Sequence, residues 1–135
     1  ALGTDSAASN NRLDLFAEMR LASLLAKVTQ GDAAALPAAT VLRMATLGGA
    51  RAVGLDDRIG SLVPGKDADV VAVDFSSVAL APCYDPVSHL VHAAGREHVS
   101  DVWIEGERLV DSGRLVRLDS AAITARAALW RDRIA

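Results

Sequence analysis

The feature that most constrains the fold is a long helix with apolar residues on two of its faces. The stretch "NNRLDLFAEMRLASLLAKVTQ" predicts a helix over Asn10–Gln30, because apolar residues recur at intervals of three and four. One stripe comprises Leu13, Phe16, Arg20 with Leu21, Leu24 and Val28, and the other comprises Leu15, Met19, Ala22 and Ala26. Asn10 or Asn11 is the expected N-cap, and Gly31-Asp32 the expected end. Two apolar faces require neighbours on two sides.

The residues before this helix predict the end of a strand that delivers a carboxylate. Ala1 and Leu2 are followed by Gly3-Thr4-Asp5 and then by the small residues "SAASNN". We expect Asp5 at the C-terminal end of a strand, where α/β barrels gather catalytic groups. A turn-capping role for Asp5 is the alternative. One strand and one helix cannot bury both helix faces, so we expect residues 1–55 to be the end of a larger α/β domain.

The remaining elements change in character near residue 55. A second helix is expected to begin at Pro37, with Gly48-Gly49 permitting a break and Gly54 ending it. A Pro64-Gly65 turn then precedes a buried strand over Ala68–Val73. Short strands are expected around 102–104, 108–110 and 115–118, with turns at Glu105-Gly106 and Ser112-Gly113. A closing helix capped by Ser120 carries Ile123, Ala127, Trp130 and Ile134 on one face.

Composition excludes several classes of partner. The 135 residues are 51% hydrophobic, which suffices for a core, and carry a net charge of −3 without a basic run. Nucleic acid is therefore not expected as a partner, because phosphate binding needs clustered Lys and Arg. No apolar run approaches the length of a membrane span, and no secretory leader is evident. Cys83 is the sole cysteine, so we expect a structural thiol without a disulfide and a cytoplasmic location.

Other candidate motifs favour structural roles. His89 and His92 lie three apart and could share a metal on one helix face, but no carboxylate or cysteine at ligand spacing supports that interpretation, and ordinary packing is favoured for them and for His98. "PGKDAD" has one glycine and no following helix, so Lys66 and its neighbours indicate a turn rather than a phosphate loop. "GGARAVGL" lacks the strand that must precede a dinucleotide fingerprint. Asp5 is the only candidate catalytic group.

Three stretches together resemble the C-terminal third of the amidohydrolase superfamily. They are "GTDSAASNNRLDLFAEMRLASLLAK", "LRMATLGGARAVGLDDRIGSLVPGKDADVVAVD" and "YDPVSHLVHAAGREHVSDVWIEGERLVDSGRL", and they occur in the family's order. The subgroup that contains 5′-methylthioadenosine/S-adenosylhomocysteine deaminases is the most similar. Triazine hydrolases and guanine deaminases share the layout.

The resemblance implies a fold and a site. The fold is α/β: the last strand and closing helices of a metal-dependent (β/α)8 barrel over 1–55, strands of a small β-sandwich over 56–118, and a C-terminal helix over 119–135. In the family the residue matching Asp5 is a ligand of one catalytic zinc and takes a proton from the metal-bound water. The substrate, which Asp5 would meet through that water, is expected to be an adenosine-type nucleoside that is deaminated to its inosine analogue.

The resemblance also implies what this chain does not supply. Family histidines that complete the zinc site lie on earlier barrel strands, and His89, His92 and His98 do not match them. A barrel needs about 250 residues, so we expect activity only together with an N-terminal barrel portion. A homo-oligomer is also expected. The alternatives are a sister aminohydrolase or chlorohydrolase acting on guanine or triazines, and a non-catalytic packing or oligomerisation module.

Overall fold

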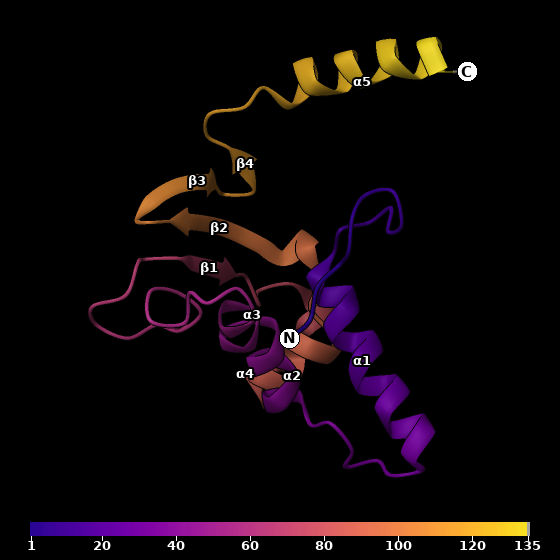
Figure 1. The fold of residues 1–135 in the computed structure, drawn as a ribbon, viewed down its shortest axis with the longest axis vertical. Coiled ribbons are helices and arrows are strands. Elements are labelled where there is room, and N and C mark those ends of the chain that lie inside the picture. The colour runs from indigo at the N-terminus through magenta and orange to yellow at the C-terminus, as the bar shows by residue number, and fades with distance from the viewer. Residues whose placement is uncertain (135) are drawn as a thin grey trace.

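The computed structural model describes residues 1–134 and arranges them as a group of helices, a small sheet and a separate C-terminal helix (Figure 1). The helices α1, α2, α3 and α4 gather on one side of the sheet, whereas α5 lies beyond the opposite side. Their bounds are Leu15–Gln30, Ala38–Ala45, Leu47–Ala52, Pro86–His92 and Ser120–Ile134. Short 3₁₀ turns η1 and η2 span Val78–Leu80 and Arg96–His98. Helices followed by a small β unit agree with the expected order.

Helix α1 begins later than its apolar periodicity predicts. The N-cap is Asp14, whose side chain accepts hydrogen bonds from the N–H groups of Phe16 and Ala17, so the expected caps Asn10 and Asn11 are wrong. Leu13 has a left-handed φ of 47°, which keeps the preceding residues out of the helix. The predicted end is confirmed, because Gly31 is the C-cap with φ of 62°. The sequence "DLF" held the cap signal, since Asp is a preferred N-cap residue.

The expected second helix is divided in two. Helix α2 follows Pro37 as predicted, but Thr46 has φ −111° and ψ −96°, which ends α2 and starts α3 two residues before Gly48. The loop between α1 and α2 is held in place by two polar side chains of α1. Ser23 is fully buried and donates to the Leu36 carbonyl at 3.1 Å, and the Lys27 ammonium donates to the Ala35 carbonyl at 2.7 Å.

The sheet is antiparallel throughout, in the order β1-β2-β3-β4. Its strands are Val70–Val73, Val99–Ile104, Glu107–Asp111 and Arg114–Leu115. Both predicted turns are confirmed, and Glu105, Gly106, Ser112 and Gly113 all have positive φ, as a two-residue type I′ hairpin requires. The last strand is shorter than predicted and β1 is only partly buried, with Val71 55% exposed, because β1 forms an edge of the sheet.

The core lies among the helices. Met19, Val41 and Val91 form its buried centre, contributed by α1, α2 and α4. Leu2 packs against this cluster, and its N–H donates to the Met44 carbonyl at 3.2 Å, while residues 1–6 adopt no regular element. Residues 86–92, for which the sequence indicated only amphipathic packing, thus form a helix that completes the core. The strand expected at Ala1–Asp5 stays a prediction.

Helix α5 begins at Ser120 as predicted, but Ser120 does not cap it. Asp119 Oδ1 accepts hydrogen bonds from the N–H groups of Ala121 and Ala122, at 2.9 and 3.1 Å. A carboxylate one residue earlier therefore performs the capping role. Every residue of α5 is exposed. Over residues 1–134, the helices are all too short or too polar to span a bilayer.

Candidate functional site

The candidate catalytic residue, Asp5, lies exposed at the start of the loop that leads to α1. Its backbone is left-handed, with φ of 58°, and its carboxylate oxygen Oδ1 accepts the Ser6 N–H at 2.7 Å. This bond, followed by one from the Ser9 hydroxyl, lowers the pKa of Asp5. The carboxylate is therefore held ionised, which is the form that binds a cation or accepts a proton.

The loop after Asp5 folds into a tight turn. The N–H groups of Ser9 and Asn10 both donate to the Ser6 carbonyl, at 3.1 and 2.9 Å. Residues 6–9 carry small, exposed side chains, so Asp5 has open surroundings on this side. The turn that the sequence offered as an alternative for Asp5 is present, because its side chain does bond to the next N–H. An exposed, ionised carboxylate beside small residues is also accessible to a ligand.

The histidines are not brought to Asp5 as a ligand set. His89 Nδ1 lies 3.3 Å from the Asp85 carbonyl, its ring meets Phe75 edge-on with centroids 6.2 Å apart, and His98 Nδ1 accepts the Gly95 N–H at 3.1 Å. Burial, and then the charges of Lys27 and Arg20, lower the pKa of His92. Across residues 1–134, no three side chains of His, Cys, Asp or Glu lie close enough together to hold a metal ion.

The other sequence motifs have structural roles or none that the structure shows. Lys66 Nζ donates to the carbonyls of Asp56 and Ile59, the latter at 3.0 Å, which fastens the turn predicted at this position. Asp67 pairs with Arg58 at 2.6 Å. Cys83 is exposed rather than packed, so the predicted structural role of its thiol is not found.

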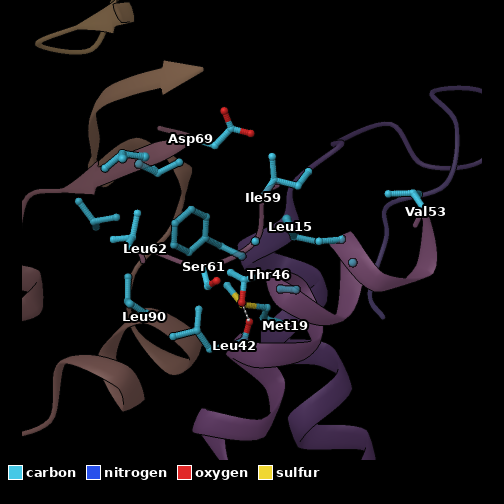
Figure 2. A pocket seen from close by; sticks show the side chains of 18 residues that line it. Leu15, Met19, Leu42, Thr46, Val53, Ile59, Ser61, Leu62, Asp69 and Leu90 are labelled. Atoms are coloured by element: carbon cyan, nitrogen blue, oxygen red, sulfur yellow. Dashed lines mark hydrogen bonds between the residues drawn. The ribbon is translucent and has the colours of Figure 1, made fainter. Parts of the chain in front are cut away.

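An apolar cavity of about 550 Å³ opens between the helices and β1. Figure 2 shows side chains from α1, α2, α4 and the 59–62 loop converging on it, including Met19, Leu42 and Leu90. The Thr46 hydroxyl donates to the Leu42 carbonyl at 2.8 Å, and Asp69 Oδ1 accepts the Glu105 N–H at 2.9 Å. Asp5 does not line this cavity, whose mostly apolar lining has the character of an uncovered packing surface.

Residues that fix the Asp5 loop are the part of the site that the sequence did not reveal. Asn10 Nδ2 donates to Glu18 Oε1 at 2.7 Å, and Arg96 Nη1 donates to the Arg12 carbonyl at 3.0 Å. Glu18 lies one position beyond the N3 site at which a capping box places an acceptor, so capping patterns do not indicate its contact with Asn10. Arg96 lies 84 residues from Arg12, and no local pattern predicts that contact.

Comparison with known proteins gives consistent matches along the chain. The model of the amidohydrolase family matches residues 1–109. A 5-methylthioadenosine/S-adenosylhomocysteine deaminase from Teredinibacter turnerae is 51% identical over 134 residues, which are 99% of this chain and 30% of that protein. The chain therefore spans about 30% of the length of this relative.

Two solved structures extend the comparison to three dimensions. A crystal structure of an adenosine deaminase from Xanthomonas campestris with bound zinc matches 99% of this chain and 30% of its own, with a TM-score of 0.96 and 54% identity. The atrazine chlorohydrolase TrzN from Arthrobacter aurescens, complexed with zinc, matches 92% of this chain and 28% of its own, with a TM-score of 0.85 and 30% identity.

Proposed function

Since the chain belongs to the amidohydrolase family, we propose that it is the C-terminal part of a zinc-dependent aminohydrolase that deaminates an adenosine-type nucleoside. The substrate is 5′-methylthioadenosine or S-adenosylhomocysteine, and the products are the inosine analogue and ammonia. The observation that carries this proposal is the difference in identity. Relatives named as deaminases of adenosine-type compounds are 51% and 54% identical to the chain, whereas the triazine-acting relative is 30% identical.

The chemistry of Asp5 fits one ligand of a zinc ion. Its carboxylate is exposed and ionised, and it has no cationic partner among residues 1–134. Zinc accepts carboxylate oxygen together with histidine nitrogen, and catalytic sites use about three protein ligands. Within residues 1–134, Asp5 is not part of a group of three possible metal ligands. The remaining ligands would therefore come from the N-terminal portion, which the length of the relatives implies.

The role of Asp5 in the reaction is proton transfer. When bound, zinc lowers the pKa of a coordinated water towards 7. Asp5, whose Oδ1 accepts the Ser6 N–H, would accept a proton from the attacking water. It would then pass that proton to the amino group at C6 of the adenine ring, so that the C6–N bond breaks and ammonia leaves as the C6–O bond forms. The second proton of the water stays with the product, on N1 of the ring.

The arrangement proposed for the whole protein follows the family resemblance. Residues 1–55 would complete a (β/α)8 barrel, residues 56–118 would contribute strands to a β-sandwich, and residues 119–135 would form the C-terminal helix. The match of the Xanthomonas campestris structure over 99% of the chain supports this layout. Activity would require the N-terminal barrel portion, and we expect a cytoplasmic homo-oligomer.

A substrate panel with the longer protein that contains this chain tests the proposal. Ammonia release would be measured with 5′-methylthioadenosine, S-adenosylhomocysteine, adenosine, guanine and atrazine, alongside zinc content. Asp5→Asn is expected to lower the rate by about 10²–10⁴-fold, while the exposed Asp57→Asn serves as a control of equal charge change. Turnover of guanine or atrazine in place of adenosine compounds would favour a sister hydrolase. Absence of zinc and of all turnover would favour a non-catalytic module.

A further inference from the structure

The loop between Asp5 and α1 has an unusual backbone conformation at both of its ends. In Figure 1 it is the indigo stretch that rises beyond the N-terminal end of α1. Both of its ends have left-handed backbone, with φ of 58° at Asp5 and 47° at Leu13. Such angles are uncommon for residues other than glycine, less so for Asp than for Leu, and at Leu13 they require enforcement by the surroundings. The side chains of residues 6–9 are small and exposed, so packing does not supply that enforcement.

A relay of three hydrogen bonds joins Glu18 on α1 to the Asp5 carboxylate. Glu18 Oε1 accepts from Asn10 Nδ2 at 2.7 Å, the Asn10 N–H donates to the Ser6 carbonyl at 2.9 Å, and the Ser6 N–H donates to Asp5 Oδ1 at 2.7 Å. Asn10 is committed at both ends, because its Oδ1 also accepts the Arg12 N–H at 3.1 Å. Every step passes through a donor and an acceptor that have no freedom to exchange roles.

A second anchor holds the other end of the loop. Arg96, on η2, donates from Nη1 to the Arg12 carbonyl at 3.0 Å. The Arg12 guanidinium in turn contacts Asp14 Oδ2 at 3.0 Å, and Asp14 is buried, with 4% of its surface exposed. The loop is therefore fixed to α1 through Glu18 and to the segment after α4 through Arg96.

We propose that Glu18 and Arg96 are positioning residues for Asp5: together they hold the 6–14 loop so that the Asp5 carboxylate keeps one orientation. The expected effect on catalysis rests on the proposed function, whereas the expected effect on the conformation of the loop does not. Residues that orient a metal ligand from behind affect metal affinity or activity by about 10–100-fold when they are removed. Glu18 is charged and lies near the helix N-terminus, so a purely helix-stabilising role must be separated from positioning.

The separating experiment compares Glu18→Ala with Glu18→Gln in the longer, zinc-loaded protein. Glutamine keeps an acceptor for Asn10 but loses the charge that favours the helix N-terminus. We expect Glu18→Ala to speed amide hydrogen exchange over residues 6–10 by about tenfold or more, to weaken zinc in competition with a chromophoric chelator by about 10–100-fold, and to lower kcat more than it changes KM. Glu18→Gln should restore all three. Glu107→Ala, which breaks the exposed pair with Arg117 at 2.5 Å, is the matched control and should leave them unchanged.

Further variants and outcomes decide the question. Asn10→Ala removes the hydrogen bond to Glu18 from the loop side and replaces Glu18→Ala if that variant does not fold. Arg96→Ala removes the bond to the Arg12 carbonyl, so it should speed hydrogen exchange over residues 11–14 instead. Unchanged exchange and zinc affinity in Glu18→Ala, or a Glu18→Gln variant that behaves like Glu18→Ala, would overturn the proposal. If the wild-type protein deaminates no nucleoside, the proposed function fails, but faster loop exchange and weaker zinc binding in Glu18→Ala would still support positioning.

Discussion

Helices α1 and α5 differ greatly in what covers their apolar residues. Met19 of α1 meets Val41 of α2 and Val91 of α4, and all three are at most 4% exposed. On α5, Ile123, Trp130 and Ile134 repeat at helical spacing yet stay 48%, 56% and 81% exposed. Figure 1 shows the reason, because α5 lies beyond the sheet and away from the other helices.

The comparison teaches that an apolar stripe predicts a helix but not what buries it. Most of the stability of a helix in a protein comes from packing of its apolar face. Helix α1 obtains that packing from segments up to about 70 residues away in the chain, as the contact between Met19 and Val91 shows. Helix α5 obtains none from residues 1–134, so it should open more readily than α1.

The largest expected difference between the two helices is in the cost of truncating an apolar side chain. Met19→Ala removes a buried side chain and leaves a cavity, so we expect a loss of about 2–5 kcal/mol in the free energy of unfolding. Leu129→Ala, at a position 63% exposed on α5, should change it by less than about 0.5 kcal/mol. Urea unfolding followed by circular dichroism measures both. Equal losses would show that another part of the protein covers α5.

A second comparison uses two glycines, one packed on the helices and one in the exposed hairpin near α5. Gly60 has φ of 84°, and an added Cβ would lie 2.7 Å from Ala50 Cβ and 3.0 Å from Leu47 Cα. Gly113 has φ of 75° but no atom within 4 Å of such a Cβ. Both substitutions by alanine impose the same backbone strain. Overpacking should make Gly60→Ala costlier by about 1–3 kcal/mol. Similar unfolding midpoints for the two variants would show that α3 yields to the extra carbon.

Much of the secondary structure follows from local patterns in the sequence. The α1 stripe, the Gly31 stop and the two hairpin turns are each specified by residues within a few positions of one another. Helix starts were less certain, because several residues that can act as caps stood in a row. Asn10 or Asn11 was the N-cap expected from the sequence, whereas the left-handed backbone at Leu13 places the cap at Asp14.

The candidate site was predictable only in part. Asp5 was predicted from its place after Gly-Thr and from the family resemblance. The structure shows it exposed, with Oδ1 accepting the Ser6 N–H, and its catalytic role stays a proposal. The residues that fix its loop depend on tertiary contact. The Arg96 contact spans 84 residues, and the Glu18 contact depends on where the loop turns, so spacing along the chain indicates neither.

The two tryptophans allow the two regions to be compared in one measurement. Trp103 lies half-buried in β2 with the Arg108 guanidinium carbon 5.5 Å from its ring centroid, whereas Trp130 lies exposed on α5. In the 135-residue chain, Trp103→Phe leaves fluorescence from Trp130 alone, and Trp130→Phe leaves fluorescence from Trp103 alone. We expect the first variant to emit at longer wavelength and to be quenched more strongly by acrylamide. The reverse order would mean that α5 is buried and the sheet is open.

The smallest expected effect is a pH dependence of stability that belongs to the helical group and not to α5. Burial of His92, and then the charges of Lys27 and Arg20, lower the pKa of His92 below its usual 6.5. The unfolded chain therefore binds a proton at this residue more readily than the folded one, and stability must fall as pH falls below about 6.5 towards the folded pKa. The loss of stability between about pH 7.5 and pH 5 should be smaller in His92→Gln than in the wild type. Unfolding midpoints of the two proteins at both pH values measure this difference, and an equal loss in both would assign the dependence to other groups.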